Sequence, residues 1–151
     1  MSPASVRSLV LPLALAGLAA LPCTALAASD PDGKYRGALT ADNVVDGGPV
    51  NFDVASNGTR IKRWRVTMNV TCASYPVKVE LITQTMPTMK VARNGTFRSV
   101  FTGPVQKIDD VRIVVSGRLK GRRVTQGRIS YDVGFRSGRC TRTAAWTAKV
   151  R

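Results

Sequence analysis

From Ala28 to its end, this chain alternates apolar and polar side chains with a period of two. Such alternation is typical of β-strands with one buried face, because successive side chains of a strand point to opposite faces. It is clearest from Trp64 to Cys72, where every second residue is apolar. No segment of this part shows the apolar spacing of a helix, at i, i+3, i+4 and i+7. The pattern therefore predicts an all-β fold.

The alternation recurs in about eight segments that are joined by short polar turns. The residues that we expect to face inward are Tyr35 and Leu39; Val50, Phe52 and Val54; Trp64, Val66, Met68, Val70 and Cys72; Val77, Val79 and Leu81; Phe97 and Phe101; Val111, Ile113 and Val115; Ile129, Tyr131, Val133 and Phe135; and Trp146, Ala148 and Val150. Successive hairpins with one buried face each favour a sandwich or a barrel. We predict one antiparallel β-barrel or barrel-like β-sandwich of about eight strands; the spacings do not separate the two.

The dipeptide Asn57-Gly58 lies between two apolar runs and predicts a β-hairpin turn. A two-residue loop there places Val54 opposite Ile61, with both facing inward. The same register leaves the next tryptophan on the outer face unless the strand contains an extra residue. We therefore predict a β-bulge near Lys62 or Arg63.

Two further glycines predict local backbone geometry. The segment Arg93-Asn94-Gly95 fits a three-residue hairpin loop with Gly95 in the left-handed region, which places Val91 opposite Phe97. Gly127 lies where the alternation changes phase and predicts a bend or bulge.

The last strand contains one conflict, since Arg142 shares the parity of Cys140 and Trp146. We predict a bulge or an irregular start before Ala144, which would remove the conflict. We interpret Trp146 as a core residue, with a ligand platform as the alternative.

The first residues have the three zones of a secretory signal. Arg7 supplies the positive charge, an apolar stretch follows over residues 9–21, and Ala25-Leu26-Ala27 fits the site that signal peptidase reads. We predict a signal peptide over 1–27 and a single β domain over 28–151. The expected location is secreted or extracellular, with association with the cell envelope as a further option.

The cysteines agree with export. Cys23 leaves with the predicted signal, and its lipidation and a signal retained as an anchor are the alternatives. Cys72 and Cys140 remain, and an even count in an exported chain predicts a disulfide. Closing so long a loop would stabilise the fold by about 4 kcal/mol; two free buried thiols are the alternative. No CxxC pair and no histidine are present, so we expect no metal or other cofactor.

Positive charge dominates the chain, whose net charge of +14 becomes +13 once Arg7 is removed. Solubility of a small domain needs a net charge of about 2 to 8. The basic residues that alternate with the apolar ones, and so face outward, are Lys34, Arg36, Arg63, Arg65, Lys78, Arg98, Arg112, Arg118, Lys120, Arg128 and Arg136. This parity predicts a basic outer face, although a merely solvated face would show the same pattern.

Two clusters of basic residues stand out and are our candidate anion-binding residues. They are Arg60, Lys62, Arg63 and Arg65, and then Arg118, Lys120, Arg122 and Arg123. A field of this sign attracts polyanions at low salt. Nucleic acid is disfavoured as the partner, because nearly all aromatic residues share the apolar parity and are not available for base stacking.

Catalysis has few candidate residues, since the chain contains no histidine and one glutamate, Glu80. We therefore expect a non-enzymatic binding module whose basic outer face binds wall polymers, acidic glycans or anionic lipid surfaces. A protein-binding or inhibitor module that acts through exposed loops is the alternative.

Several motifs resemble those of short exported β-domain proteins of GC-rich bacteria. The motifs are Gly33-x-Tyr35-x-Gly37, Val50-x-Phe52-x-Val54, Asn94-Gly95-x-Phe97, Gly117-Arg118-Leu119, Gly127, Cys140 and Trp146-x-Ala148. The resemblance implies an exported β domain and no particular activity. Gly33-x-Tyr35 is also similar to the Gly-x-Trp hallmark of lipocalin-type barrels, with tyrosine in place of tryptophan.

Overall fold

The structure is a computed structural model, which describes residues 30–40, 47–103, 110–135 and 138–151. The predicted signal over 1–27, Cys23 and Arg136 lie outside these ranges. The described residues form nine strands and no helix, so the prediction of an all-β fold is confirmed.

The strands are β1 (Gly33–Leu39), β2 (Pro49–Ala55), β3 (Arg60–Ala73), β4 (Lys78–Thr85), β5 (Met89–Lys90), β6 (Thr96–Thr102), β7 (Asp110–Lys120), β8 (Arg123–Phe135) and β9 (Gly138–Val150). They form one antiparallel sheet in the order β4-β3-β2-β1-β9-β8-β7-β6, so β4 and β6 are its edges. The two-residue β5 pairs with β3 outside this order.

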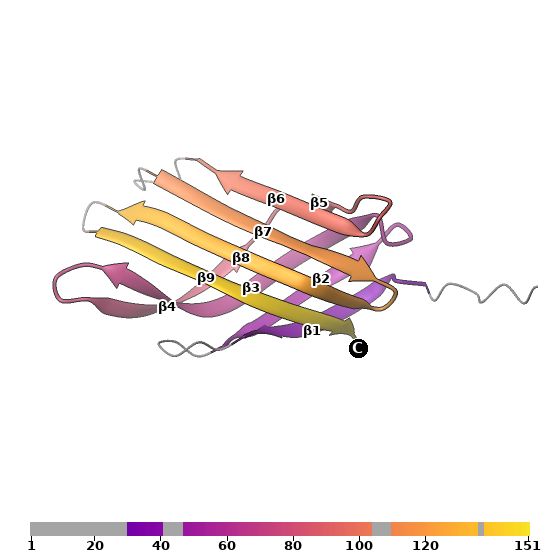
Figure 1. The fold of residues 1–151 in the computed structure, drawn as a ribbon, viewed down its shortest axis with the longest axis horizontal. Helices are drawn as coiled ribbons and strands as arrows, with labels where there is room; N and C mark the ends of the chain where they lie inside the picture. Colours follow the sequence, from indigo (N-terminus) through magenta and orange to yellow (C-terminus); the bar gives the residue numbers. More distant parts are fainter. Residues whose placement is uncertain (1–29, 41–46, 104–109, 136–137) are drawn as a thin grey trace, which may run out of the picture.

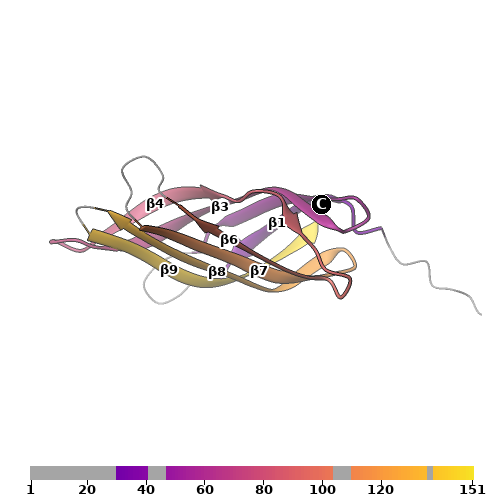
Figure 2. The same cartoon turned by 90° about the horizontal axis from the view of Figure 1, so that it is seen from above.

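The sheet curls into two layers, which Figures 1 and 2 show from two directions. One layer contains β6, β7, β8 and β9, and the other contains β1 to β4. Near the end of β3, Cys72 pairs with Cys140 of β9. Near its start, Ile61 pairs with Met89 of β5. The result is a flattened barrel that is closed in part, which agrees with the predicted β-barrel or barrel-like β-sandwich. Cys72 and Cys140 form the predicted disulfide, with an S–S distance of 2.03 Å.

Five aromatic rings fill the space between the layers in one half of the barrel. Tyr35 stacks on Phe52 with ring centroids 5.0 Å apart, and Trp146 lies 5.8 Å from Phe52, 6.1 Å from Trp64 and 6.0 Å from Phe97. Trp146 is 1% exposed, so it is a core residue as predicted. Such ring pairs add about 0.5–1.5 kcal/mol each beyond the area that they bury.

The predicted bend at Gly127 makes room for this cluster. The register between β8 and β9 shifts between Val124 and Gly127, and Gln126 has a φ of 54°. A Cβ atom on Gly127 would lie 2.4 Å from Cδ2 of Trp146, well inside contact distance. The tryptophan ring therefore requires glycine at this position.

Both predicted hairpins are confirmed. Val54 lies opposite Ile61, the Asn57-Gly58 turn has positive φ angles, and the predicted bulge falls at Arg63, whose φ is 52°. In the second hairpin Val91 lies opposite Phe97, and Gly95 has a φ of 82°.

The orientation predicted for β4 is wrong. Val77, Val79 and Leu81 were expected in the core, but they are 69%, 54% and 71% exposed. Lys78 and Glu80 have the inward parity instead, although both side chains remain exposed.

Pairing with β3 explains this inversion. Residues directly opposite each other in an antiparallel pair share a face. Lys78 lies opposite the buried Cys72, and Glu80 lies opposite the buried Val70. The core therefore determines the faces of β3, and the short turn between the two strands imposes these faces on β4, whatever its own alternation.

The irregularity predicted before Ala144 is also wrong. β9 pairs with β8 without a register shift from Gly138 to Trp146, so Arg142 points inward and is 5% exposed. Its Nη1 donates a hydrogen bond to the backbone oxygen of Asn69 at 2.7 Å. Charge-assisted hydrogen bonds of this kind offset part of the cost of burying a guanidinium.

Candidate anion-binding surface

The structure places both predicted basic clusters at the same end of the molecule. Arg60, Lys62, Arg63 and Arg65 lie at the start of β3, and Arg118, Lys120, Arg122 and Arg123 lie around the β7–β8 turn; all eight are exposed. Asp32 accepts hydrogen bonds from the N–H groups of Asn57 and Gly58 in the β2–β3 turn. The hydroxyl of Tyr35 lies 3.4 Å from the backbone oxygen of Gly121 in the β7–β8 turn. The two clusters nevertheless belong to different layers, and β2, β1 and β9 lie between them in the order of the sheet.

One member of the first cluster is neutralised. The guanidinium of Arg63 forms a salt bridge with Asp53 of β2. The bulge at Arg63 brings this residue beside Asp53, which pairs with the preceding residue, Lys62. Arg63 therefore offers less charge to a ligand than its neighbours Arg60 and Arg65.

Cross-strand pairing aligns two members of the second cluster with two cations that lie far from them in the sequence. Arg36 of β1 lies opposite Lys149 of β9, Lys149 lies opposite Arg123 of β8, and Arg123 lies opposite Lys120 of β7. We call Arg36, Lys149, Arg123 and Lys120 the basic row. All four side chains are exposed, and they come from four adjacent strands.

The basic row concentrates charge on a short stretch of surface. Neighbouring strands lie about 4.8 Å apart, so the four positions span about 14 Å. Like charges directly opposite each other destabilise a sheet by a few tenths of a kcal/mol per pair or more. Within the described ranges, no carboxylate forms a salt bridge with any residue of the row. A bound anion would relieve this repulsion.

The basic row also continues toward the first cluster and borders a groove. Asn51 of β2 lies opposite Arg36 on one side and Arg65 of β3 on the other, so a neutral amide separates the row from Arg65. An open groove of ≈ 860 Å³ runs over β1, β9 and β8. It is lined by Arg36, Gly37, Ala38, Arg123, Val124, Thr125, Thr147, Ala148, Lys149, Val150 and Arg151.

The sequence predicted only part of this arrangement. Lys120 and Arg123 belong to a predicted cluster, Arg36 was expected to face outward, and Lys149 was missed. The alternation that turns Trp146 and Ala148 inward also turns Lys149 outward. The sequence could therefore have predicted that Lys149 faces outward. Its position beside Arg36 depends on the pairing of β1 with β9, which joins opposite ends of the chain.

At the opposite end of the barrel, a cation is paired with acids. Nη2 of Arg139 lies 2.8 Å from Oδ2 of Asp132 and 3.3 Å from Oδ2 of Asp110. The hydrogen bond from Arg139 is the main cause that lowers the pKa of Asp132 below its ordinary value. The uncompensated charge of the basic row is therefore not a general feature of the outer face.

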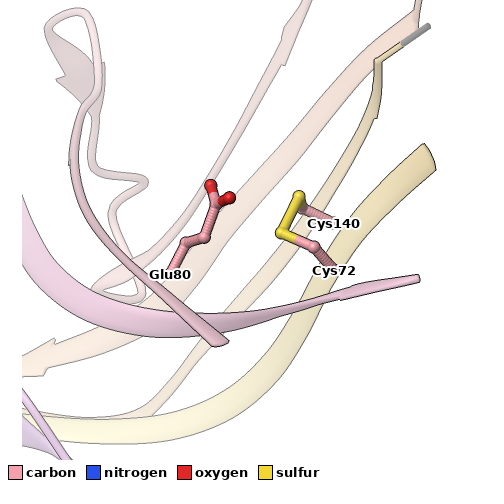
Figure 3. Close-up of side chains that lie close together, drawn as sticks. All are labelled: Cys72, Glu80 and Cys140. Carbon is pink, nitrogen blue, oxygen red and sulfur yellow. A yellow bond between two sulfur atoms is a disulfide. The ribbon is translucent and has the colours of Figure 1, made fainter. Parts of the chain in front are cut away.

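Near this second end, Glu80 approaches the disulfide, as Figure 3 shows. Ligand atoms of Cys72, Glu80 and Cys140 lie within 4.8 Å of one another. The two sulfur atoms are bonded to each other and provide no thiolate, so Glu80 alone would offer a negative ligand. The negative charge of Glu80 also raises the pKa of Tyr131, although burial of the phenol is the larger cause.

Comparison with known proteins finds no protein family, no curated protein and no solved structure that matches this chain. The resemblance to short exported β-domain proteins therefore stays a prediction. In the part of the chain that the structure describes, no helix has the length and apolar character needed to span a membrane.

Proposed function

We propose that this protein is an exported, non-enzymatic binding module whose basic row takes anionic polymers of the envelope or the extracellular space. The observation that carries the proposal is the alignment of Arg36, Lys149, Arg123 and Lys120 on adjacent strands without a carboxylate partner among the described residues. The disulfide supports an oxidising location, since such bonds persist outside the cytosol.

A repeating anion matches this surface better than a single small ligand. The cations lie on the open outer face of the sheet, where water screens each charge, so one contact contributes little. A polymer that presents several negative groups contacts several cations at once and releases counterions from each contact. Wall polymers, acidic glycans and anionic lipid headgroups share this chemistry.

The aromatic residues argue against base stacking at the basic row. The two most exposed aromatic residues are Tyr75 and Phe135, at 104% and 37%. Both lie at the disulfide end, far from Arg36 and Lys149. Binders of single-stranded nucleic acid place exposed rings within the basic groove. Among the described residues, the basic row has no such ring beside it, so we expect it to bind polymers that carry negative charge and no bases.

The test is chromatography of the protein on three supports, which carry heparin, a wall polymer or anionic vesicles. Each column is eluted with a rising salt gradient. We expect retention at low salt, and the three supports distinguish the sources of the anion. Replacement of Arg36, Lys149 and Arg123 by glutamine should lower the slope of log affinity against log salt by about three, or one per lost contact.

A matched control removes the same charge elsewhere on the outer face. Arg98, Arg112 and Arg128 are exposed and lie outside the basic row, so their triple glutamine variant should elute close to the parent. Equal elution of the two triple variants would show that net charge alone drives binding. Passage of the parent through all three supports at low salt would contradict the proposal.

A further inference from the structure

The edge strand β4 has an unpaired side. It pairs with β3 from Lys78 to Thr85, and no other described strand pairs with it. An edge strand presents N–H and C=O groups that remain able to pair with another chain. Figure 1 shows that the β3–β4 hairpin forms one end of the molecule.

The outer face of this edge is apolar. Val77, Val79 and Leu81 are all more than half exposed. Natural proteins usually protect an edge with charged or bulged residues. On the outer face, β4 carries no charged side chain, whereas the other edge, β6, carries Arg98. The charged residues of β4, Lys78 and Glu80, have the opposite parity. An apolar unpaired edge favours addition of a strand from a second molecule.

We propose that two copies of this chain pair antiparallel through β4, with Val79 on the two-fold axis. In this register Lys78 of each copy lies opposite Glu80 of the other, and Val77 lies opposite Leu81. Because the dimer has two-fold symmetry, each of these contacts forms twice. The pairing thus places opposite charges together on one face and apolar side chains together on the other, and both kinds of pair stabilise a sheet.

The neighbouring registers are less favourable. With Glu80 on the axis, the two Glu80 carboxylates would face each other, and like charges directly opposite destabilise a sheet. With Leu81 on the axis, Glu80 would lie opposite Ile82, and Lys78 opposite Gln84. Neither Lys78 nor Glu80 forms a salt bridge with any described residue, so both are available to a partner.

The first test is a charge-reversal cycle, with the dimer dissociation constant measured by sedimentation velocity on the exported protein. We expect Lys78→Glu and Glu80→Lys each to raise this constant by about ten-fold, because each change creates two like-charge pairs. The double variant restores the opposite charges and should return close to the parent. A parent that is monomeric at all concentrations, or a double variant as weak as the singles, would overturn the proposal.

The second test locates the axis by disulfide formation. Val79→Cys places one thiol opposite its symmetry mate, and mild air oxidation should produce a covalent dimer on a non-reducing gel. Leu81→Cys is the matched control. Its thiol would lie opposite Val77, where no second thiol is present, so this variant should run as a monomer. A covalent dimer from Leu81→Cys but not from Val79→Cys would show that the register is wrong.

Discussion

At one end of the barrel, Trp146 and four other aromatic rings fill the space between the layers. At the other end, the layers meet at the Cys72–Cys140 disulfide, and Arg142 occupies part of the interior. The basic row lies over the first end. The apolar side chains of β4 and the salt bridges of Arg139 lie at the second.

The comparison indicates that different interactions stabilise the two ends. Burial of five aromatic rings stabilises the first end, which also carries the basic row. The second end buries fewer large side chains, because β4 directs Val79 and Leu81 to solvent. A covalent cross-link and an ion pair stabilise that end instead.

The largest expected effect comes from removing the cross-link. The double replacement of Cys72 and Cys140 by serine should lower the free energy of unfolding by about 4 kcal/mol, since the bond closes a long loop of the unfolded chain. Urea denaturation measures this change. Reductant should weaken the parent and leave the double variant unchanged. Equal stability of the reduced and oxidised parent would contradict the role given to the disulfide.

An intermediate effect is expected in the aromatic half. Gly127→Ala should destabilise the protein by about 2–3 kcal/mol, because the added Cβ overlaps the ring of Trp146. Gly134→Ala is the control on the same strand, where a Cβ would lie at an ordinary 3.5 Å from Asp110. In thermal unfolding, Gly127→Ala should have a clearly lower melting temperature than Gly134→Ala. Similar melting temperatures would show that the packing around Trp146 is looser than described.

The smallest expected effect is a pH dependence at the disulfide end. The pKa of Asp132 is lowered from 3.8 in the folded protein, mainly by its hydrogen bond with Arg139. A carboxylate with a lowered folded pKa stabilises the fold above its unfolded pKa, and this contribution is lost as the pH falls through the folded value. Asp132→Asn should therefore be slightly less stable than the parent at neutral pH.

The same variant should match the parent in strongly acidic solution, where both side chains are uncharged. Urea denaturation across the pH range measures the difference. Arg139→Gln should show at least the same loss at neutral pH, since it removes the contact with Asp132 and also the one with Asp110. A constant difference between Asp132→Asn and the parent at all pH values would contradict the ion pair.

Local patterns predicted most of the fold. Alternation identified the strands, and Asn57-Gly58 and Gly95 identified two turns with their registers. These predictions succeeded because a strand with one buried face, and a turn that needs positive φ, each depend on residues near in sequence.

Two predictions of orientation were wrong, and both concern residues at the disulfide end. In β4 the alternation of Val79 and Leu81 was real, but the face that it predicted was wrong, because β3 determines the register. In β9 the regular pairing with β8 kept Arg142 inside. The outcome in β4 depends on its partner strand, so its own residues could not supply it. In β9 the alternation itself placed Arg142 inward, and the prediction failed because it added an irregularity to keep the guanidinium out of the core.

The sequence by itself determined the strands, the turns, the cysteine pair and the excess of positive charge, since each depends on composition or on near neighbours. Only the tertiary structure decided which strands became adjacent. Arg36 and Lys149 lie side by side because β1 pairs with β9, and β4 turns Val79 and Leu81 outward because its register is fixed by β3. The physical reason is that sheet pairing joins distant segments through backbone hydrogen bonds, which carry no side-chain signature in the sequence.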